Sequence, residues 1–211
     1  LTVTTLLLCF FCIAFAQTLF GVDVSQPVSH ADFSCLKTKG NDFAIVRAYR
    51  STGAPDPAAS PTIAAARAAG INYVDVYLFP CPKCGDGASQ VSSMVSALGA
   101  SKYGVIWLDI EGPQYWLSSA SENQQFMSEL ISGCTSSGHK CGIYTSESQW
   151  TEIFGSSYTA YGNFPLWYPH YDDNPSFSDF TPFGGFTKPN IKQYKGDATL
   201  CGVGVDINWY P

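Results

Sequence analysis

From residue 20 onward, short apolar runs alternate along the chain with longer amphipathic stretches. The short runs predict β-strands, and the amphipathic stretches predict α-helices. Strands are expected at 20–25, 43–49, 71–79, 103–110, 140–145, 164–168, 191–194 and 203–208. Four of the expected helices fall at 61–69, 88–98, 121–133 and 147–154. Such alternation is typical of parallel strands joined by crossover helices.

The helical pattern stops after residue 154, where loops rich in Gly and Pro separate the remaining strands. We count about eight strands and about five helices, which predicts an α/β fold, an incomplete TIM-like (β/α)5β3 barrel whose last helices are replaced by loops. The chain has no internal repeat, charge run or low-complexity tail. We therefore expect one domain, from 17 to 211.

Two acids stand at the end of the expected strand at 103–110, Asp109 within it and Glu111 directly after it. Side chains alternate between the faces of a strand, so these two carboxyls point the same way, about 7 Å apart. The apolar residues between and before them occupy the other face, which we expect to pack against helices. Two close carboxylates resist ionising together, and one pKa is raised. The pair therefore predicts an acid and a base for catalysis.

Two other expected strands, at opposite ends of the chain, each carry one acid opposite an apolar face. These acids are Asp23 and Asp206. If the strands close into one barrel, both acids meet Asp109 and Glu111 at its mouth, where a cluster of acids indicates a functional site. The alternative is that Asp23 and Asp206 serve as turn or capping residues, a common use of aspartate near strand ends.

Residues 1–16 carry no charge, are mostly apolar and end in Ala14-Phe15-Ala16. This small-x-small pattern precedes signal-peptidase cleavage, so we expect a signal peptide that lacks its initiator Met and basic leader, with Gln17 as the mature start. A membrane anchor is the competing interpretation. About sixteen apolar residues are short for a span, and no basic flank follows. We expect a protein that is secreted or delivered to a phagosomal or lysosomal lumen, without stable membrane association.

Two of the eight cysteines, Cys9 and Cys12, lie in the expected signal peptide. The six others indicate disulfides in a secreted chain, although their fifteen possible pairings leave the connectivity open. The pairing that we favour is Cys81 with Cys84, Cys134 with Cys141, and Cys35 with Cys201. The Cys81-Pro82-Lys83-Cys84 motif is also found in thiol oxidoreductases, but glycines rather than a helix start are expected after it. No second closely spaced pair indicates a zinc site, and no metal is expected.

The chain carries 17 acidic and 11 basic residues, a net charge of −6. Such a balance argues against nucleic acid as the partner. Aromatic residues make up 15% of the chain and charged residues only 13%. A weakly charged, aromatic-rich chain with acids in a cleft favours a carbohydrate ligand. We expect a monomer that needs no cofactor.

Several short motifs, in this order and spacing, resemble the family 25 glycoside hydrolases, lysozymes of the Chalaropsis type. The similarity covers about 20–210 and is strongest to secreted members from amoebae and nematodes. The motifs are Gly21-Val22-Asp23-Val24-Ser25-Gln26, Trp107-Leu108-Asp109-Ile110-Glu111, Gly142-Ile143-Tyr144, Leu166-Trp167-Tyr168-Pro169-His170-Tyr171, Gln193-Tyr194 and Val205-Asp206-Ile207-Asn208.

This resemblance implies an irregular, flattened barrel and cleavage of the β-1,4 bond between N-acetylmuramic acid and N-acetylglucosamine in bacterial peptidoglycan. Glu111 then matches the proton donor, with a pKa raised by its neighbours. Asp109 would stay ionised and stabilise the oxocarbenium-like transition state or the substrate's acetamido group. Asp23 and Asp206 would orient these two carboxyls.

The resemblance also implies substrate contacts for the aromatic residues Tyr144, Trp167 and Tyr171, because flat rings stack on sugar faces. Gln193 falls in a matching motif and is expected to bind substrate as well. Surface or packing positions are expected for His30, His139 and His170. Two other functions stay open: a lectin-like protein that binds the wall glycan or chitin without cutting it, and a barrel hydrolase directed at chitin.

Overall fold

The computed structural model describes residues 18–211. The expected signal peptide, with Cys9 and Cys12, lies outside the described residues. Within 18–211, none of the helices is long and apolar enough to cross a membrane.

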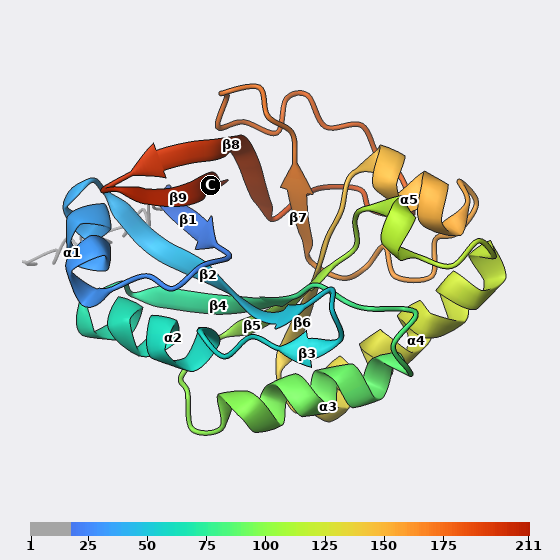
Figure 1. Cartoon of the computed structure of the whole chain (residues 1–211). Helices are drawn as coiled ribbons and strands as arrows, with labels where there is room; N and C mark the ends of the chain where they lie inside the picture. The colour runs from blue at the N-terminus through green and yellow to red at the C-terminus, as the bar shows by residue number, and fades with distance from the viewer. Residues whose placement is uncertain (1–17) are drawn as a thin grey trace, which may run out of the picture.

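The chain forms strands and helices in alternation (Figure 1). The strands are β1 (Leu19–Val24), β2 (Asn41–Arg50), β3 (Ala54–Pro55), β4 (Tyr73–Leu78), β5 (Val105–Asp109), β6 (Lys140–Tyr144), β7 (Leu166–Pro169), β8 (Ile191–Leu200) and β9 (Val203–Tyr210). The helices are α1 (His30–Thr38), α2 (Ala59–Ala68), α3 (Gly87–Leu98), α4 (Ala120–Ser136) and α5 (Glu147–Phe154), with a 3-10 turn, η1 (Pro113–Tyr115).

The strands join in the order β1-β9-β8-β7-β6-β5-β4-β2, and a parallel pairing of β1 with β2 closes the barrel. The two-residue β3 adds only to the edge of β2. This arrangement confirms the predicted α/β barrel of eight strands and five helices. Strand β9 is antiparallel to both of its neighbours, β8 and β1. It therefore brings residues to the barrel mouth from the opposite chain direction.

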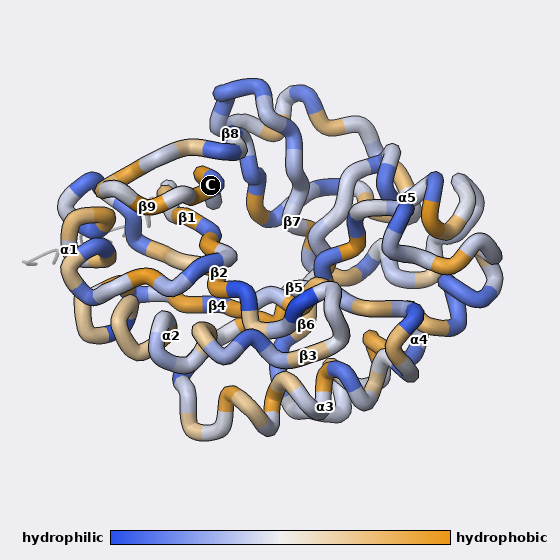
Figure 2. The backbone as a smooth tube through the Cα atoms, in the orientation of Figure 1, coloured by the Kyte–Doolittle hydropathy of each residue, from blue (hydrophilic) through white to orange (hydrophobic). Residues whose placement is uncertain are grey.

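The four predicted helix positions are confirmed to within a few residues. Helix α3 illustrates the reason, because Val91, Met94 and Leu98 on one of its faces are buried. Hydrophobic segments alternate with less hydrophobic ones along α3 in Figure 2. The hydrophobic pattern does not predict a position for helix α1, because only two of its nine residues, Phe33 and Leu36, are both hydrophobic and buried. Its start was marked instead by a capping box.

The barrel has two apolar layers. The alternate apolar residues of the β5 segment, Ile106, Leu108 and Ile110, belong to the layer between sheet and helices, as predicted. A second layer fills the barrel interior and consists of Phe43, Ile45, Tyr77, Trp107, Tyr144, Trp167 and Ile191. Three residues of this inner layer, Tyr77, Tyr144 and Trp167, also line a pocket at the mouth of the barrel, so the layer forms the floor of that pocket.

All three predicted disulfides are present, Cys35–Cys201, Cys81–Cys84 and Cys134–Cys141. Helix α3 begins at Gly87 with Asp86 as its cap, so Gly85 and Asp86 separate the Cys81–Cys84 pair from the helix start. A side chain of helix α3 also binds the backbone of the pair. The side chain of Gln90 accepts a hydrogen bond from the Cys81 N–H at 2.9 Å and donates one to the Cys81 carbonyl at 2.8 Å.

Candidate active site

A pocket of about 90 Å³ at the barrel mouth brings together all four acids singled out in the sequence. Its lining is Asp23, Tyr77, Asp109, Glu111, Tyr144, Trp167, Tyr171, Gln193 and Asp206. Asp23 lies on β1 directly opposite Asp206 on β9, so the antiparallel pairing of these two strands makes the acids neighbours. The alternative that both acids serve only as turn or capping residues does not account for this shared pocket.

Asp109 is the last residue of β5, and Glu111 lies just beyond the end of the strand. Hydrogen bonding between β5 and β6 continues for one more residue, because the Ile110 N–H donates to the Tyr144 carbonyl at 2.8 Å. The chain then turns at Gly112, which has a φ of 62° that favours glycine. The side chain of Gln149 accepts a hydrogen bond from the Gly112 N–H at 2.8 Å. These contacts fix the backbone on both sides of Glu111.

Gln193 connects the acids to the aromatic wall. Its amide nitrogen donates to Asp23 at 2.8 Å and to Asp206 at 3.3 Å. Its amide oxygen accepts from the hydroxyls of Tyr144 and Tyr171, both at 2.8 Å. The side chain is buried and its hydrogen-bonding groups are used within the protein. This arrangement suits a residue that holds acids and tyrosines in register better than one that binds substrate directly.

Burial raises the pKa of all four acids in the pocket, and repulsion between these acids adds to the rise for Asp23, Asp109 and Glu111. Burial, followed by the charge of Asp206, raises the pKa of Asp23 to about 8, although Asn208 and Gln193 donate hydrogen bonds to its carboxylate. Burial and then Asp206 raise the pKa of Glu111. For Asp109, burial and the adjacent Glu111 hold the pKa well above its ordinary value. The pocket therefore keeps protons at a pH where exposed carboxyls have lost them.

One carboxylate oxygen in the pocket has no partner. Oδ1 of Asp109 is buried and accepts no hydrogen bond from any residue between 18 and 211. A buried acceptor without a partner is costly, so this atom is suited to receive a donor from a ligand.

The predicted substrate-binding aromatics differ in accessibility. Tyr171 is 56% exposed and stands at the rim. Tyr144 is buried but lines the pocket. Trp167 is only 2% exposed, and its indole N–H donates to Asn208 at 2.7 Å, so it lies in the pocket floor with little ring surface for a sugar.

A second, larger hollow of about 500 Å³ adjoins the acid pocket and shares Glu111, Tyr144 and Tyr171 with it. Its walls come from the start of α5 and from the long connection between β7 and β8, drawn in orange in Figure 1. The remaining lining residues are Ser146, Glu147, Ser148, Gln149, Tyr168, Pro169, His170, Asp179, Thr181 and Phe183. Pocket and hollow together form a cleft in which an extended polymer can lie across Glu111.

Two features of the site were missed in the sequence. Arg47 lies near the pocket, held by Asp56 at 2.8 Å, and its charge opposes the rise in the pKa of Asp109. Its spacing from Phe43 and Ile45, four and two residues before it on the inward face of β2, was the available signal. The other missed feature is a charged cluster around His170.

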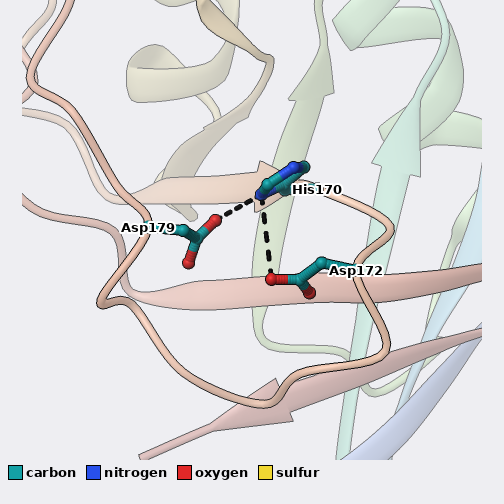
Figure 3. A group of neighbouring side chains, drawn as sticks. All are labelled: His170, Asp172 and Asp179. Atoms are coloured by element: carbon teal, nitrogen blue, oxygen red, sulfur yellow. Dashed lines mark hydrogen bonds and ion pairs between the residues drawn. The ribbon is translucent and has the colours of Figure 1, made fainter.

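That cluster comprises His170, Asp172 and Asp179 and is drawn in Figure 3. Their ligand atoms lie within 4.8 Å of one another, as in some metal sites. However, Nζ of the buried Lys192 lies 2.8 Å from a carboxylate oxygen of each aspartate. A divalent cation would have to sit beside this ammonium group, which disfavours a metal here.

Comparison with known proteins agrees with this geometry. The family model described as "Lysozyme-like protein 1" matches residues 14–194. "Probable GH family 25 lysozyme 2" from Dictyostelium discoideum is 53% identical over 193 residues, which cover 90% of each chain. "Lysozyme-like protein 5" from Caenorhabditis elegans is 38% identical and covers 95% of each chain.

Solved structures share the fold. A family 25 lysozyme from Aspergillus fumigatus superposes with a TM-score of 0.78 at 22% identity, covering 92% of this chain and 94% of that one. A bacterial lysozyme from Streptomyces coelicolor superposes with a TM-score of 0.73 at 25% identity, covering 91% of each chain. Because one relative is 53% identical over nearly the whole chain and the barrel is shared, this chain belongs to the family 25 glycoside hydrolases, the lysozymes of the Chalaropsis type.

Proposed function

We propose that this glycoside hydrolase cleaves bacterial peptidoglycan at the β-1,4 bond between N-acetylmuramic acid and N-acetylglucosamine. The observation that carries the proposal is the pocket in which Asp109 and Glu111 meet Asp23 and Asp206. The adjoining hollow lengthens this pocket into a cleft, as a polymeric substrate requires. A structural neighbour from Acremonium alcalophilum is named a muramidase, which supports the same bond.

In this proposal Glu111 is the general acid that protonates the leaving oxygen. A general acid works best when its pKa lies near the operating pH. Burial and the charge of Asp206 raise the pKa of Glu111 in that direction. Glu111 is also partly accessible and lines both the pocket and the hollow, so it can reach a bond that lies across them.

Asp109 must be ionised to stabilise positive charge that develops at the sugar. Without substrate, burial and Glu111 favour its protonated form. The unpartnered Oδ1 is a position where the N–H of a substrate acetamido group can donate a hydrogen bond. Such a bond stabilises the carboxylate, so that substrate binding leaves the proton on Glu111.

Asp23, Asp206 and Gln193 complete the site by holding its geometry. Gln193 bonds to both aspartates and to the hydroxyls of Tyr144 and Tyr171. Of the predicted sugar-contacting rings, we assign this role to Tyr171 and Tyr144 on their position in the lining, and we assign Trp167 to their support.

The decisive experiment compares wild type with Glu111→Gln on purified peptidoglycan. We expect the substitution to lower kcat by about 10²- to 10⁴-fold, as for the loss of a general acid, with little change in wall binding. Released reducing ends give the rate, and mass spectrometry of the products identifies the bond. Glu152→Gln is the matched control, because Glu152 is an exposed glutamate on α5 outside both cavities.

Two results would contradict the proposal. Wild-type protein that binds walls but releases no saccharide, like Glu111→Gln, would indicate a lectin. Faster cleavage of chitin oligomers than of peptidoglycan would indicate a chitin-directed hydrolase.

We also propose that the enzyme works outside the cytosol, either secreted or in a phagosomal or lysosomal lumen. Three disulfides among the described residues support an oxidising compartment. Mass spectrometry of the mature amino end, expected at Gln17, tests the preceding signal peptide.

A further inference from the structure

One histidine, His170, lines the hollow beside Glu111. It follows β7 directly, and about half of its side chain is exposed. Nδ1 of the ring contacts Asp179 and lies 3.9 Å from Asp172 (Figure 3). The backbone around it is also fixed, because the His170 N–H donates to the Gln193 carbonyl at 2.9 Å. His170 is therefore held in place by the same strand that carries the central residue of the acid pocket.

The charges behind His170 are arranged around a buried lysine. Lys192 is 0% exposed, and its ammonium group donates to Asp172 and Asp179 at 2.8 Å each and to the Ser176 carbonyl at 3.0 Å. Partial burial works against ionisation of Asp179, but hydrogen bonds from Lys192 and His170 outweigh it and lower the pKa of Asp179 to about 2. Two carboxylates and one ammonium leave one net negative charge, and the ring of His170 lies against it.

The second ring nitrogen of His170 has no protein partner. Nδ1 is used by Asp179, whereas Nε2 makes no hydrogen bond to the residues between 18 and 211. In Figure 3 the far side of the ring points away from both carboxylates. Since His170 and Asp179 both line the hollow, Nε2 is the position at which this cluster can donate a hydrogen bond to a ligand.

His170 differs from the other titratable groups that line the hollow, which are carboxyls and tyrosine hydroxyls. The titratable groups that face it are Glu147 at the rim, Asp179, Glu111, and the hydroxyls of Tyr144, Tyr168 and Tyr171. Lys and Arg are absent from this lining, and Lys192 is buried behind it. His170 is thus the basic side chain that this lining offers to a substrate.

We propose that His170 binds a carboxylate of the substrate, donating a charge-assisted hydrogen bond from Nε2 within the hollow. This proposal rests on the proposed peptidoglycan hydrolysis and adds a recognition element to it. Peptidoglycan carries carboxylates on its lactyl groups or peptides, whereas chitin carries only neutral N-acetylglucosamine. His170 therefore selects wall glycan over chitin, and the Asp172–Lys192–Asp179 cluster keeps its ring in position.

The test compares wild type and His170→Ala on native peptidoglycan and on peptidoglycan whose carboxyls have been converted to amides. On native walls we expect His170→Ala to raise KM roughly tenfold with kcat nearly unchanged, the size of one charge-assisted hydrogen bond. On amidated walls the two proteins should differ less than about twofold. His30→Ala is the control, since His30 is an exposed histidine on α1 outside the cavities.

A second variant and a third substrate sharpen the result. His170→Gln keeps an N–H donor without the imidazole ring, so its KM should lie between those of wild type and His170→Ala. Peptidoglycan stripped of its peptides distinguishes the two sources of carboxylate. Removal of the peptide hydrolyses its amide bond and frees the lactyl carboxylate, so a penalty for His170→Ala that persists or grows shows binding of the lactyl group, and a vanished penalty assigns the peptide.

An equal penalty on native and amidated walls would overturn the proposal, as would a loss confined to kcat. Failure of peptidoglycan hydrolysis itself is separate, because wild type would then release no reducing ends from any of these substrates.

Discussion

At the scale of single residues, the site depends on carboxyls whose pKa is raised by burial. Asp23 is the clearest example, because it is 7% exposed and its pKa is raised to about 8 by burial and by Asp206. An unfolded aspartate has a pKa near 3.8. Between these two values the folded chain binds the proton that the unfolded chain has released, so folding becomes less favourable as pH rises.

This loss of stability with rising pH leads to a prediction for the substitution Asp23→Asn. Wild type should lose thermal stability between pH 5 and pH 8, and the variant, which cannot ionise, should lose less. At pH 8 we expect the variant to melt at least roughly 3 °C above wild type, while its activity falls. Differential scanning calorimetry at the two pH values measures the effect. A variant that melts below wild type at pH 8 would show that Asp23 is ionised there without cost.

At the scale of elements, pairing of the chain ends decides the site. Asp23 and Asp206 are neighbours only because β1 pairs with β9. The Cys35–Cys201 disulfide cross-links the parts of the chain next to these two strands. Cys35 on α1 and Cys201 after β8 are separated by 166 residues, whereas Cys81 and Cys84 are separated by 3. A cross-link between distant residues removes more entropy from the unfolded chain than a local one.

The two disulfides should therefore differ in their contributions to stability. Replacing Cys35 and Cys201 by serine should lower the free energy of unfolding by ~5 kcal/mol, and replacing Cys81 and Cys84 by ~2 kcal/mol, from loop entropy. Urea unfolding followed by tryptophan fluorescence measures both. Equal losses would mean that the bonds act through native contacts instead of chain entropy.

At the scale of the whole molecule, the net charge of −6 opposes binding to an anionic wall. This repulsion weakens when wall carboxyls are partly protonated, and the raised pKa of Glu111 favours the same acidic range. Since the general acid must carry its proton, activity should fall as pH rises through the pKa of Glu111.

Salt provides a test of the repulsion. At pH 7, raising ionic strength from about 10 mM to about 150 mM shortens the screening length from about 30 Å to about 8 Å. We expect KM for whole walls to fall over this range, while KM for short soluble fragments changes little. Clearing of wall suspensions and fragment hydrolysis provide the two values. Weaker wall binding at the higher salt would indicate attraction instead.

Much of the fold and site could be predicted from the sequence because the signals were local. Alternation placed the strands, and the acids Asp109 and Glu111 stood out at the end of an apolar run. Helix α1 could not be placed, since few of its residues are buried. Gln193, by contrast, was expected to touch substrate, and only its four hydrogen bonds revealed its place among the acids and tyrosines.

The sequence by itself determined the strand and helix rhythm, the barrel class and the acids that can supply chemistry, because side-chain periodicity and residue type are local properties. Tertiary structure alone decided which groups face one another. It made β9 antiparallel to both neighbours, buried Trp167 in the floor, and brought Lys192 behind His170. Those outcomes depend on contacts between residues far apart in the chain, for which a linear pattern carries no signal.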